Sequence, residues 1–440
     1  MSAMKPLPVV QKATRITLSD FRSPQMRAFH MAWFAFFVCF FAWFGIAPLM
    51  PVVREELQLT PAQVGTTIIA SVAVTILARL LVGRLCDRFG PRRTYAGLLI
   101  LGSLPVMGIG LADSYETFLL FRLAIGMIGA AFVTTQYHTT LMFAPNIVGT
   151  ANATTAGWGN LGGGVTQMIM PLVFSGFLAL GFSEAASWRL AMFLAGMIVM
   201  LTGVAYYFLT QDTPEGNFED LPKHPRLSSK GSFRLAARDF RVWALFALYA
   251  ACFGIELTIN NIAALYFTDY FKLDLKTAGT VASLFGLMNI FARTLGGVLG
   301  DAFGARWGLK GRVHWLFLSL LGEGLALMLF SQMQTLGLAI TTLVLFSLFV
   351  QMSEGATFAV VPFVNRKALG SVTGIVGAGG NVGAVAAGFL FQGALAWNQA
   401  LWLLGLIVTG LAFLAFTVRF SQADEAALHV ARHREPAVLS

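Results

Sequence analysis

The segment that decides the fold spans residues 78–92 and reads ARLLVGRLCDRFGPR. Residues 292–306 read ARTLGGVLGDAFGAR, and the two segments align without gaps, with nine of fifteen positions identical at an offset of 214. Two shorter matches lie at similar offsets: GNLGG at 159–163 with GNVGA at 380–384, and FGI at 44–46 and again at 253–255. Three matched segments in the same order, separated by about half of the 440 residues, predict two parallel repeats of one structural unit.

The composition indicates a protein that lies in a lipid bilayer. The chain is 57% hydrophobic and only 12% charged, with a mean hydropathy of +0.72. Because average proteins are about 25% charged, this chain cannot cover a water-exposed surface, which excludes an ordinary soluble enzyme. Three cysteines (Cys39, Cys86 and Cys252) are too few for a disulfide framework and lie in or beside apolar runs. We expect them to be small core residues.

Twelve apolar runs are long enough to cross a membrane, which takes about 20 residues each. Their centres lie near Cys39, Val72, Ser103, Ala124, Gly163, Gly196, Ala251, Gly286, Leu320, Leu343, Ala378 and Ile407. Combined with the repeat, they predict an all-α integral membrane protein with 12 transmembrane helices, built as two pseudo-symmetric six-helix halves, as in major facilitator transporters.

The distribution of Lys and Arg predicts that both termini are cytoplasmic. With the N-terminus inside, 23 of the 30 Lys and Arg fall on inner segments and about four on outer loops, which fits the positive-inside rule. The net charge of +9 therefore reflects topology, and no nucleic-acid partner is expected. We divide the chain into a cytoplasmic N-terminal tail (1–28), an N-terminal half (29–210), a cytoplasmic linker (211–240), a C-terminal half (241–420) and a cytoplasmic C-terminal tail (421–440).

Arg79 and Arg293 occupy the same position in the two repeats. Each lies eight residues before the Asp of its repeat, which places it about 12 Å inside its helix and near the middle of a bilayer core about 30 Å thick. An Arg that faced lipid at this depth would be costly, so the pair predicts a central site for a small anion. In the alternative, each Arg is neutralised by an internal Glu and only holds helices together. Arg122 has no such counterpart, and we favour a structural or gating role for it.

Glycine-rich runs in the fifth and eleventh spans contain Gly159–Asn160 and Gly380–Asn381 at matching positions. No strand precedes these glycines, so a nucleotide-binding loop is not expected, and small residues at helical spacing permit close helix packing. Packing does not explain the two asparagines, whose buried amides could donate hydrogen bonds to an oxyanion.

Ionisable residues other than Arg are rare in the spans. Importing an anion against an inside-negative potential requires coupling, and a buried carboxyl could carry the proton. Glu256 and Glu354 are our candidates, with a permanent ion pair to an arginine as the alternative, and no role is assigned to Glu323. His138 could relay protons, although a lone His among Thr and Tyr residues is more often a hydrogen-bonded core residue.

These residues resemble the nitrate/nitrite porter family of the major facilitator superfamily, from about Phe29 to Phe420. Residues 156–167 and 374–384 look like its two nitrate signatures, and Arg79 and Arg293 match its paired substrate arginines. The resemblance implies that these arginines clamp the anion, with further substrate-binding residues at Phe132, Asn160, Tyr249, Phe253, Asn381, Gly159 and Gly380. The more general facilitator motif implies gating positions at Gly83, Asp87, Arg88, Gly297 and Asp301.

The resemblance implies a transporter of the cell membrane that imports nitrate, and also nitrite, by alternating access. The sequences around Glu256 and Glu354 look more like the proton-coupled members than the exchangers, so symport with protons is the first expectation. A nitrate/nitrite antiporter on the same fold is the main alternative, and a non-transporting anion sensor is a distant one. We expect a functional monomer in the lipid bilayer, with no cofactor, no metal and no enzymatic activity.

Overall fold

The computed structural model describes residues 12–143, 148–220, 230–365, 369–392 and 395–421. Parts of the expected tails and linker therefore lie outside the described residues. The long helices of the described chain are α1 (Pro24–Phe44), α2 (Met50–Glu56), α3 (Pro61–Phe89), α4 (Pro91–Gly108), α5 (Tyr115–Ile125), α6 (Ala131–Met142), α7 (Val148–Ala179), α8 (Glu184–Leu209), α9 (Lys230–Ala237), α10 (Phe240–Phe271), α11 (Leu275–Leu287), α12 (Ala292–Ser331), α13 (Leu336–Val360), α14 (Leu369–Gly388) and α15 (Trp397–Ala412). Short 3₁₀ turns continue several of them, including η1 (Ala47–Leu49), η3 (Gly126–Ala130), η4 (Met288–Ile290), η7 (Phe389–Phe391) and η8 (Phe413–Thr417).

These helices form twelve apolar segments long enough to cross a membrane in the described residues, which confirms the expected number. Each expected centre falls inside one of them. The first begins at Pro24, five residues before the expected boundary, because the Ser23 side chain accepts a hydrogen bond from the Met26 N–H and Pro24 suits the first helical turn. The long helix α12 contributes to both the eighth and the ninth span and contains non-helical residues at Trp307 and Gly308.

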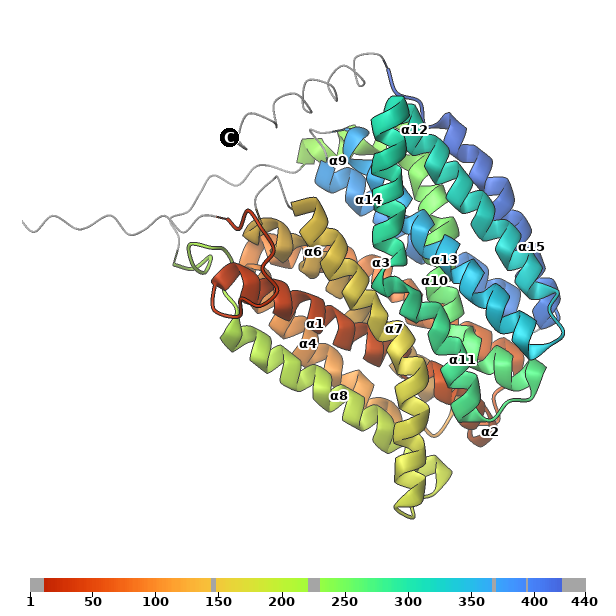
Figure 1. Cartoon of the computed structure of the whole chain (residues 1–440). Coiled ribbons are helices and arrows are strands. Elements are labelled where there is room, and N and C mark those ends of the chain that lie inside the picture. Colours follow the sequence, from red (N-terminus) through yellow and green to blue (C-terminus); the bar gives the residue numbers. More distant parts are fainter. Residues whose placement is uncertain (1–11, 144–147, 221–229, 366–368, 393–394, 422–440) are drawn as a thin grey trace, which may run out of the picture.

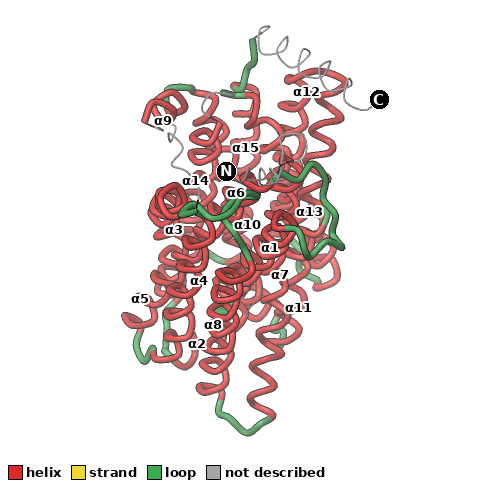
Figure 2. The backbone as a smooth tube through the Cα atoms, turned by 90° about the vertical axis from the view of Figure 1, so that its left-hand side faces the viewer, coloured by secondary structure: helices red, strands yellow, loops and turns green. Residues whose placement is uncertain are grey.

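The same helix packing occurs in both halves of the chain (Figure 1). In the N-terminal half α1 packs on α7 and α4 packs on α8; in the C-terminal half α10 packs on α14 and α12 packs on α15. The halves meet through two crossed pairs, α3 with α14 and α7 with α11. Figure 2 shows that the long helices run in roughly one direction through the bundle. We call the end with Pro24 and Phe240 the terminal end, and the opposite end, with Glu56 and Asp269, the far end.

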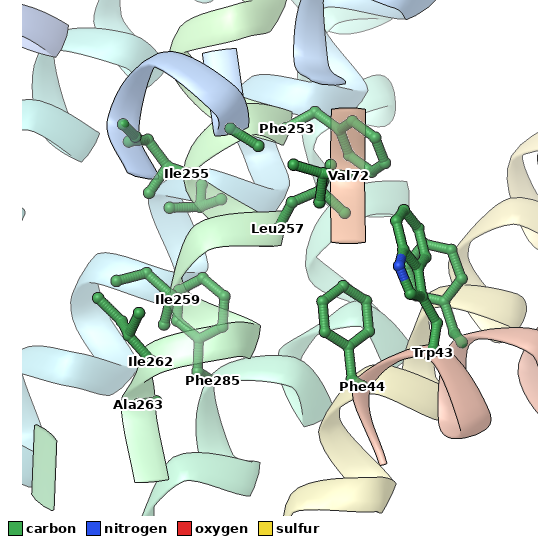
Figure 3. Packing of buried hydrophobic residues seen from close by; sticks show 14 of the residues in the cluster. Trp43, Phe44, Val72, Phe253, Ile255, Leu257, Ile259, Ile262, Ala263 and Phe285 are labelled. Carbon is green, nitrogen blue, oxygen red and sulfur yellow. The ribbon is translucent and has the colours of Figure 1, made fainter. Parts of the chain in front are cut away.

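Apolar side chains fill the interior and also cover much of the outside. One large cluster of buried residues includes side chains from both halves, and Figure 3 shows part of it, with α10 residues from Phe253 to Ala263 together with Trp43 and Phe44 of α1. On the outside, Leu111, Phe208 and Leu180 are each more than 70% exposed. Large exposed apolar residues are a liability in water but suit a surface that contacts lipid. The three cysteines are buried and form no disulfide, as expected.

Glycines allow the two halves to approach each other backbone to backbone. A Cβ atom at Gly164 of α7 would lie only 2.6–2.7 Å from the backbone of Gly286 and Leu287 in α11. Real Cβ atoms do not come this close to backbone atoms, so both positions require glycine at this separation. The contact of α7 with α11 therefore depends on the absence of side chains.

Polar contacts hold the halves together at the far end. Arg54 of α2 makes a bidentate ion pair with Asp269 of α10, with N–O distances of 2.7 and 2.8 Å. Closer to the middle, the Arg122 guanidinium is buried and donates to the Asn261 side-chain oxygen at 2.9 Å. Because Arg122 lies in the N-terminal half and Asn261 in the C-terminal half, this bond also joins the two halves.

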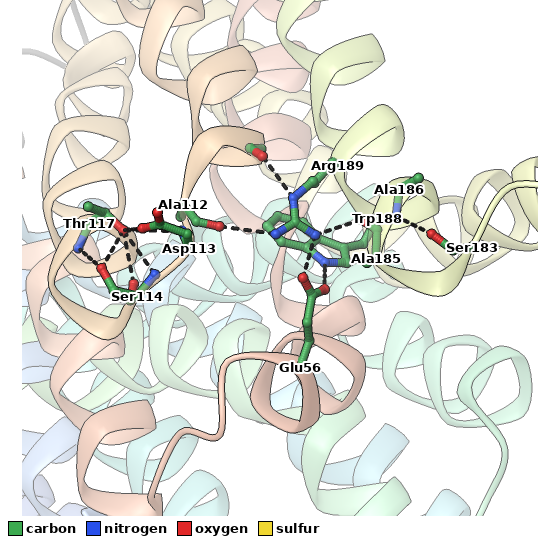
Figure 4. Close-up of polar contacts among 11 residues, drawn as sticks. Glu56, Ala112, Asp113, Ser114, Thr117, Ser183, Ala185, Ala186, Trp188 and Arg189 are labelled. Carbon is green, nitrogen blue, oxygen red and sulfur yellow. Dashed lines mark hydrogen bonds and ion pairs between the residues drawn. The ribbon is translucent and has the colours of Figure 1, made fainter.

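A second polar cluster holds the far end of the N-terminal half (Figure 4). The carboxylate of Glu56 accepts hydrogen bonds from Arg189 at 2.6 Å and from the Trp188 indole at 2.5 Å. Arg189 also donates to the carbonyls of Gly110 and Ala112. One guanidinium thus fixes the end of α2, the turn before α5 and the start of α8.

The described start of the linker is packed against the first repeat. Asp212 is 2% exposed and accepts hydrogen bonds from the backbone N–H groups of Arg92 at 2.8 Å and Phe218 at 3.0 Å. Glu219 forms ion pairs with both Arg92 and Arg93. This part of the linker therefore holds the turn between α3 and α4.

We expect Gly164→Val to separate α7 from α11, because a branched side chain cannot occupy a gap that is too small for one Cβ atom. Gly176→Val, on the same helix with no atom within 4 Å of its Cβ position, is the matched control. The measurement is the cross-linking of Arg54→Cys to Asp269→Cys by a short bifunctional thiol reagent. In the protein with both cysteine substitutions, Gly164→Val should lower the cross-linking yield several-fold, whereas Gly176→Val should not. An unchanged yield with Gly164→Val would show that this contact does not hold the far end together.

Candidate functional site

Arg79 of α3 is a buried cation that has no carboxylate partner in the described part of the chain. Its side chain is 8% exposed, and its one hydrogen bond there runs from Nη1 to the Gly377 carbonyl of α14 at 3.1 Å. Its Nε and Nη2 atoms have no hydrogen-bond partner among the described residues. The guanidinium lies 5.3 Å from the ring of Phe132 and 5.8 Å from that of Phe253. The aromatic rings partly compensate the charge and leave donors available.

Arg293 of α12 is equally buried but is neutralised. It is 6% exposed, and its Nη1 lies 2.5 Å from the Glu354 carboxylate of α13. Its Nη2 donates to the Tyr249 hydroxyl of α10 at 3.0 Å. The alternative expectation from the sequence was that an internal Glu neutralises each arginine. Such an ion pair is present at Arg293, while Arg79 has no equivalent pair among the described residues.

A pair of stacked rings connects the surroundings of the two arginines. Tyr249 and Phe253 stack with 5.2 Å between centroids and an interplanar angle of 10°. Tyr249 contacts Arg293, and Phe253 lies beside Arg79. The structure thus brings both arginines together with three of the expected aromatic residues, Phe132, Tyr249 and Phe253, at the boundary between the halves.

Glu256 lies between amides from both halves. Its carboxylate accepts a hydrogen bond from Asn160 of α7 at 3.2 Å and from Asn289 of η4 at 2.7 Å. Glu354 also interacts electrostatically with Glu256. The site therefore combines an Arg paired with a carboxylate, a second carboxyl held by two amides, and an Arg without a counter-ion among the described residues.

The two glycine-rich helices make equivalent close contacts in the two halves. A Cβ atom at Gly159 would overlap the ring of Phe36 in α1, and one at Gly380 would lie 2.9 Å from Cβ of Phe253. Both glycines thus pack against a phenylalanine of the helix beside them, and Gly380 fixes the ring that faces Arg79. The amide of Asn381 is fully buried and has no partner among the described residues.

The remaining expected residues lie away from this arrangement or outside the described side chains. His138 is buried, and its ring nitrogens lie 2.5 Å from the Tyr206 hydroxyl and 2.8 Å from the carbonyl of Gln211 at the start of the linker, so both have partners away from the two arginines. In the motif expected to gate, Arg88 is exposed and lies over the Phe89 ring. Gly83 and Gly297 leave room around their Cβ positions. The side chains of Asp87 and Asp301 lie outside the described residues.

Sequence reasoning missed two partners in this site. The first is the Gly377 carbonyl, which is a backbone group and carries no residue-type signal. The second is Asn289, a polar residue in an apolar span and four positions before Arg293. Its spacing of one helical turn from Arg293 was a signal available in the sequence.

Comparison with known proteins shows that the chain is similar to membrane transporters. The family model of the Major Facilitator Superfamily matches residues 32–361 and 247–439. High affinity nitrate transporter 2.5 of Arabidopsis thaliana is 40% identical over 88% of this chain and 78% of its own length. The nitrate/nitrite transporter NrtP of Picosynechococcus is 31% identical over 81% of this chain and 83% of its own.

The chain belongs to the nitrate/nitrite porter family of the Major Facilitator Superfamily. It is therefore a multi-pass membrane transporter and not an enzyme. Among solved structures, a bacterial homologue of the human lysosomal transporter Spinster, in an inward-facing and occupied conformation, gives a TM-score of 0.73. That match covers 92% of this chain and 99% of the other at 17% identity, so it supports the twelve-helix fold alone.

Filling the gap at Gly380 should destabilise this porter. We expect Gly380→Val to cost about 1–3 kcal/mol, because the new side chain collides with Phe253 in a packed interior. Gly374→Val is the matched control on the same helix, since nothing lies within 4 Å of its Cβ position. Thermal unfolding of the purified proteins in detergent should show a midpoint lowered by several degrees for Gly380→Val alone. Equal midpoints would mean that the Phe253 ring moves aside without cost.

Proposed function

We propose that this porter imports nitrate, and also nitrite, across the cell membrane together with protons, by alternating access. The observation that carries the proposal is the buried Arg79, whose guanidinium lies between two aromatic rings with two nitrogens unpartnered in the described chain. A planar oxyanion suits this place, because it can accept the parallel hydrogen bonds of a guanidinium and stack against the rings. The relatives named nitrate transporters support this choice of anion.

Charge balance supports proton coupling. Moving one anion inward against the membrane potential costs about 2.3 kcal/mol per 100 mV, so uptake needs a compensating charge. Arg293 cannot offer both of its donor pairs to an anion while Nη1 remains 2.5 Å from Glu354. Protonation of Glu354 would release Arg293, and Glu256, which interacts electrostatically with Glu354, gives a second place for the proton. Proton binding and anion binding would then favour each other.

Alternating access would use the contacts between the halves. With both termini in the cytoplasm, the far end faces outward, and the pair of Arg54 with Asp269 closes it. Opening would require this pair to separate and the glycine-lined contact of α7 with α11 to slide. Asn160 and Asn289 hold Glu256 from opposite halves, so this motion would also change the environment of Glu256. A single chain contains all of these groups, and a monomer surrounded by lipid is sufficient.

The second candidate is a nitrate/nitrite antiporter at the same site, in which an outgoing anion compensates the charge. The carboxyl pair favours symport, because an exchanger that never leaves the site empty does not need Glu354 to alternate between a proton and Arg293. A sensor without transport is less well supported, since the described chain has no signalling domain beside the two halves.

The deciding experiment places the purified protein in nitrite-free liposomes clamped at zero voltage, with a pH-sensitive dye inside. Addition of nitrate outside should acidify the interior, and Arg293→Ala should abolish the signal because the anion loses one of its two cations. Entry of labelled nitrate only after nitrite is loaded inside, without acidification, would establish exchange. Transport by Arg293→Ala with wild-type affinity would refute the placement of the anion.

We expect Arg79→Lys and Arg293→Lys each to raise KM for nitrate about tenfold to a hundredfold. An ammonium keeps the charge but loses the two-pronged hydrogen bond, and one charge-assisted hydrogen bond contributes about 1.5–3 kcal/mol. Arg306→Lys, an exposed residue beside Trp307, is the control and should keep wild-type KM. Initial rates of labelled nitrate uptake provide the measurement. Unchanged KM in both site variants would show that charge alone binds the anion.

A further inference from the structure

Three arginines of the N-terminal half contact α10 at regular intervals between the proposed anion site and the far end. Their partners on α10 are eight residues apart, which is about 12 Å along a helix for each step. The three contacts are Arg79 with the ring of Phe253, Arg122 with the amide of Asn261, and Arg54 with the carboxylate of Asp269. The outermost arginine has a carboxylate partner, and the two inner ones have none among the described residues.

Arg122, the middle one of these arginines, is a buried cation held by neutral groups. Its side chain is 1% exposed. Its Nη2 donates to the Asn261 side-chain oxygen at 2.9 Å, and its Nη1 donates to the Trp43 carbonyl at 3.4 Å. Its Nε has no hydrogen-bond partner in the described part of the chain. Because a charge without a counter-ion is costly in an apolar interior, an anion that reached Arg122 would be stabilised there.

An unused amide lies at the same level of α10. Asn260, the residue before Asn261, is 1% exposed, and neither atom of its side-chain amide has a partner among the described residues. Its Nδ2 lies 3.1 Å from the position that a Cβ atom of Gly163 would occupy, so it lies against the glycine-rich helix α7 of the other half. A buried amide without a partner is also costly, and its N–H groups can donate to an oxyanion. Arg122 and Asn260 therefore provide unused donors at the boundary between the halves.

A cavity lies between Arg122 and the far end. It has a volume of about 210 Å³ and lies beside Arg54. Side chains of both halves line it, among them Val64 of α3 and Leu265 of α10. Leu265 is one helical turn from Asn261, on the side of the far end. Along α10, the bond of Arg122 with Asn261 therefore lies between this cavity and the proposed anion site.

We propose that Arg122 is a second binding position for the transported oxyanion, between the outside and Arg79. Opening of the far end breaks the bond of Arg122 with Asn261, because this bond joins the two halves, and the guanidinium then faces the cavity. The incoming anion takes the place of the Asn261 oxygen. When the halves close, Asn261 displaces the anion, which moves about 12 Å along α10 to Arg79. This inference rests on the proposed nitrate import and does not depend on how that import is coupled.

The test measures initial rates of labelled nitrate uptake by cells that express the protein. A cleft of one charge sign raises the local concentration of its counter-ion about 10-fold to 1,000-fold. We therefore expect Arg122→Gln, which keeps a hydrogen-bond donor but carries no charge, to raise KM for outside nitrate about tenfold and to keep the maximal rate within about twofold. Arg122→Lys keeps the charge and should raise KM by about threefold or less. Lys276→Gln, which removes an exposed positive charge at the far end, is the control and should keep wild-type KM.

A variant of the partner residue separates anion binding from a structural role of the same bond. If the bond of Arg122 with Asn261 only held helices together, Asn261→Ala would impair uptake in the same way as Arg122→Gln. If Arg122 receives the anion, Asn261→Ala removes the group that competes with the anion, and KM for nitrate should stay at or below the wild-type value.

Two results would overturn the proposal. One is a wild-type KM in Arg122→Gln, and the other is the same rise of KM in Asn261→Ala and in Arg122→Gln. Failure of the proposed nitrate import would look different, because the wild-type protein would then take up no labelled nitrate. Failure of proton coupling alone would leave the differences in KM between the variants in place.

Discussion

The arrangement of this porter depends on the cost of holding two guanidinium groups in an apolar interior. Each must be compensated, and the two halves do so in different ways. Arg293 has a carboxylate and a phenol, whereas Arg79 has a backbone carbonyl and two aromatic faces. Of these two arginines, Arg79 is therefore the one without a carboxylate partner among the described residues. In the proposed mechanism, anion binding and the movement of the halves are linked through Arg79, because the rings and carbonyl around it come from both halves.

Close packing supplies the geometry that this chemistry needs. The glycine-rich helices α7 and α14 lie against α1 and α10 at distances that exclude side chains, and they set the positions of Phe36 and Phe253. Between the halves, the contact of Gly164 with Gly286 brings α7 and α11 together backbone to backbone. Such surfaces have few interlocking side chains, so one helix can slide over the other without repacking a core. Small residues thus position the site and would also permit the proposed motion of the halves.

Much of this could be predicted from the sequence. The repeat around Arg79 and Arg293 and the twelve apolar runs rested on spacing and hydropathy, which act locally and leave a pattern in the chain, whereas Phe132 was expected from the family resemblance. The pairing of partners could not be predicted in the same way. Whether Arg293 contacts Glu354 or Glu256 depends on how each helix is rotated and on how the halves are joined. The periodicity of a single sequence predicts neither of these. The role of the Gly377 carbonyl could not be predicted for another reason. Every residue has a backbone carbonyl, and only the fold determines which one contacts Arg79.

The contrast between the two arginines also bears on how such a molecule arises by gene duplication. Nine of fifteen positions around them are still identical, so the duplicated segment has kept its cation and its helix. What has diverged is the set of groups that contact each arginine. Arg293 contacts a carboxylate and a phenol, whereas Arg79 contacts a carbonyl and two aromatic rings. A symmetric ancestor made of two identical six-helix chains would have two equal sites and no division of labour between them. In the proposed mechanism, divergence of the neighbours, with the arginines retained, lets Arg79 recognise the anion and makes Arg293 respond to protons.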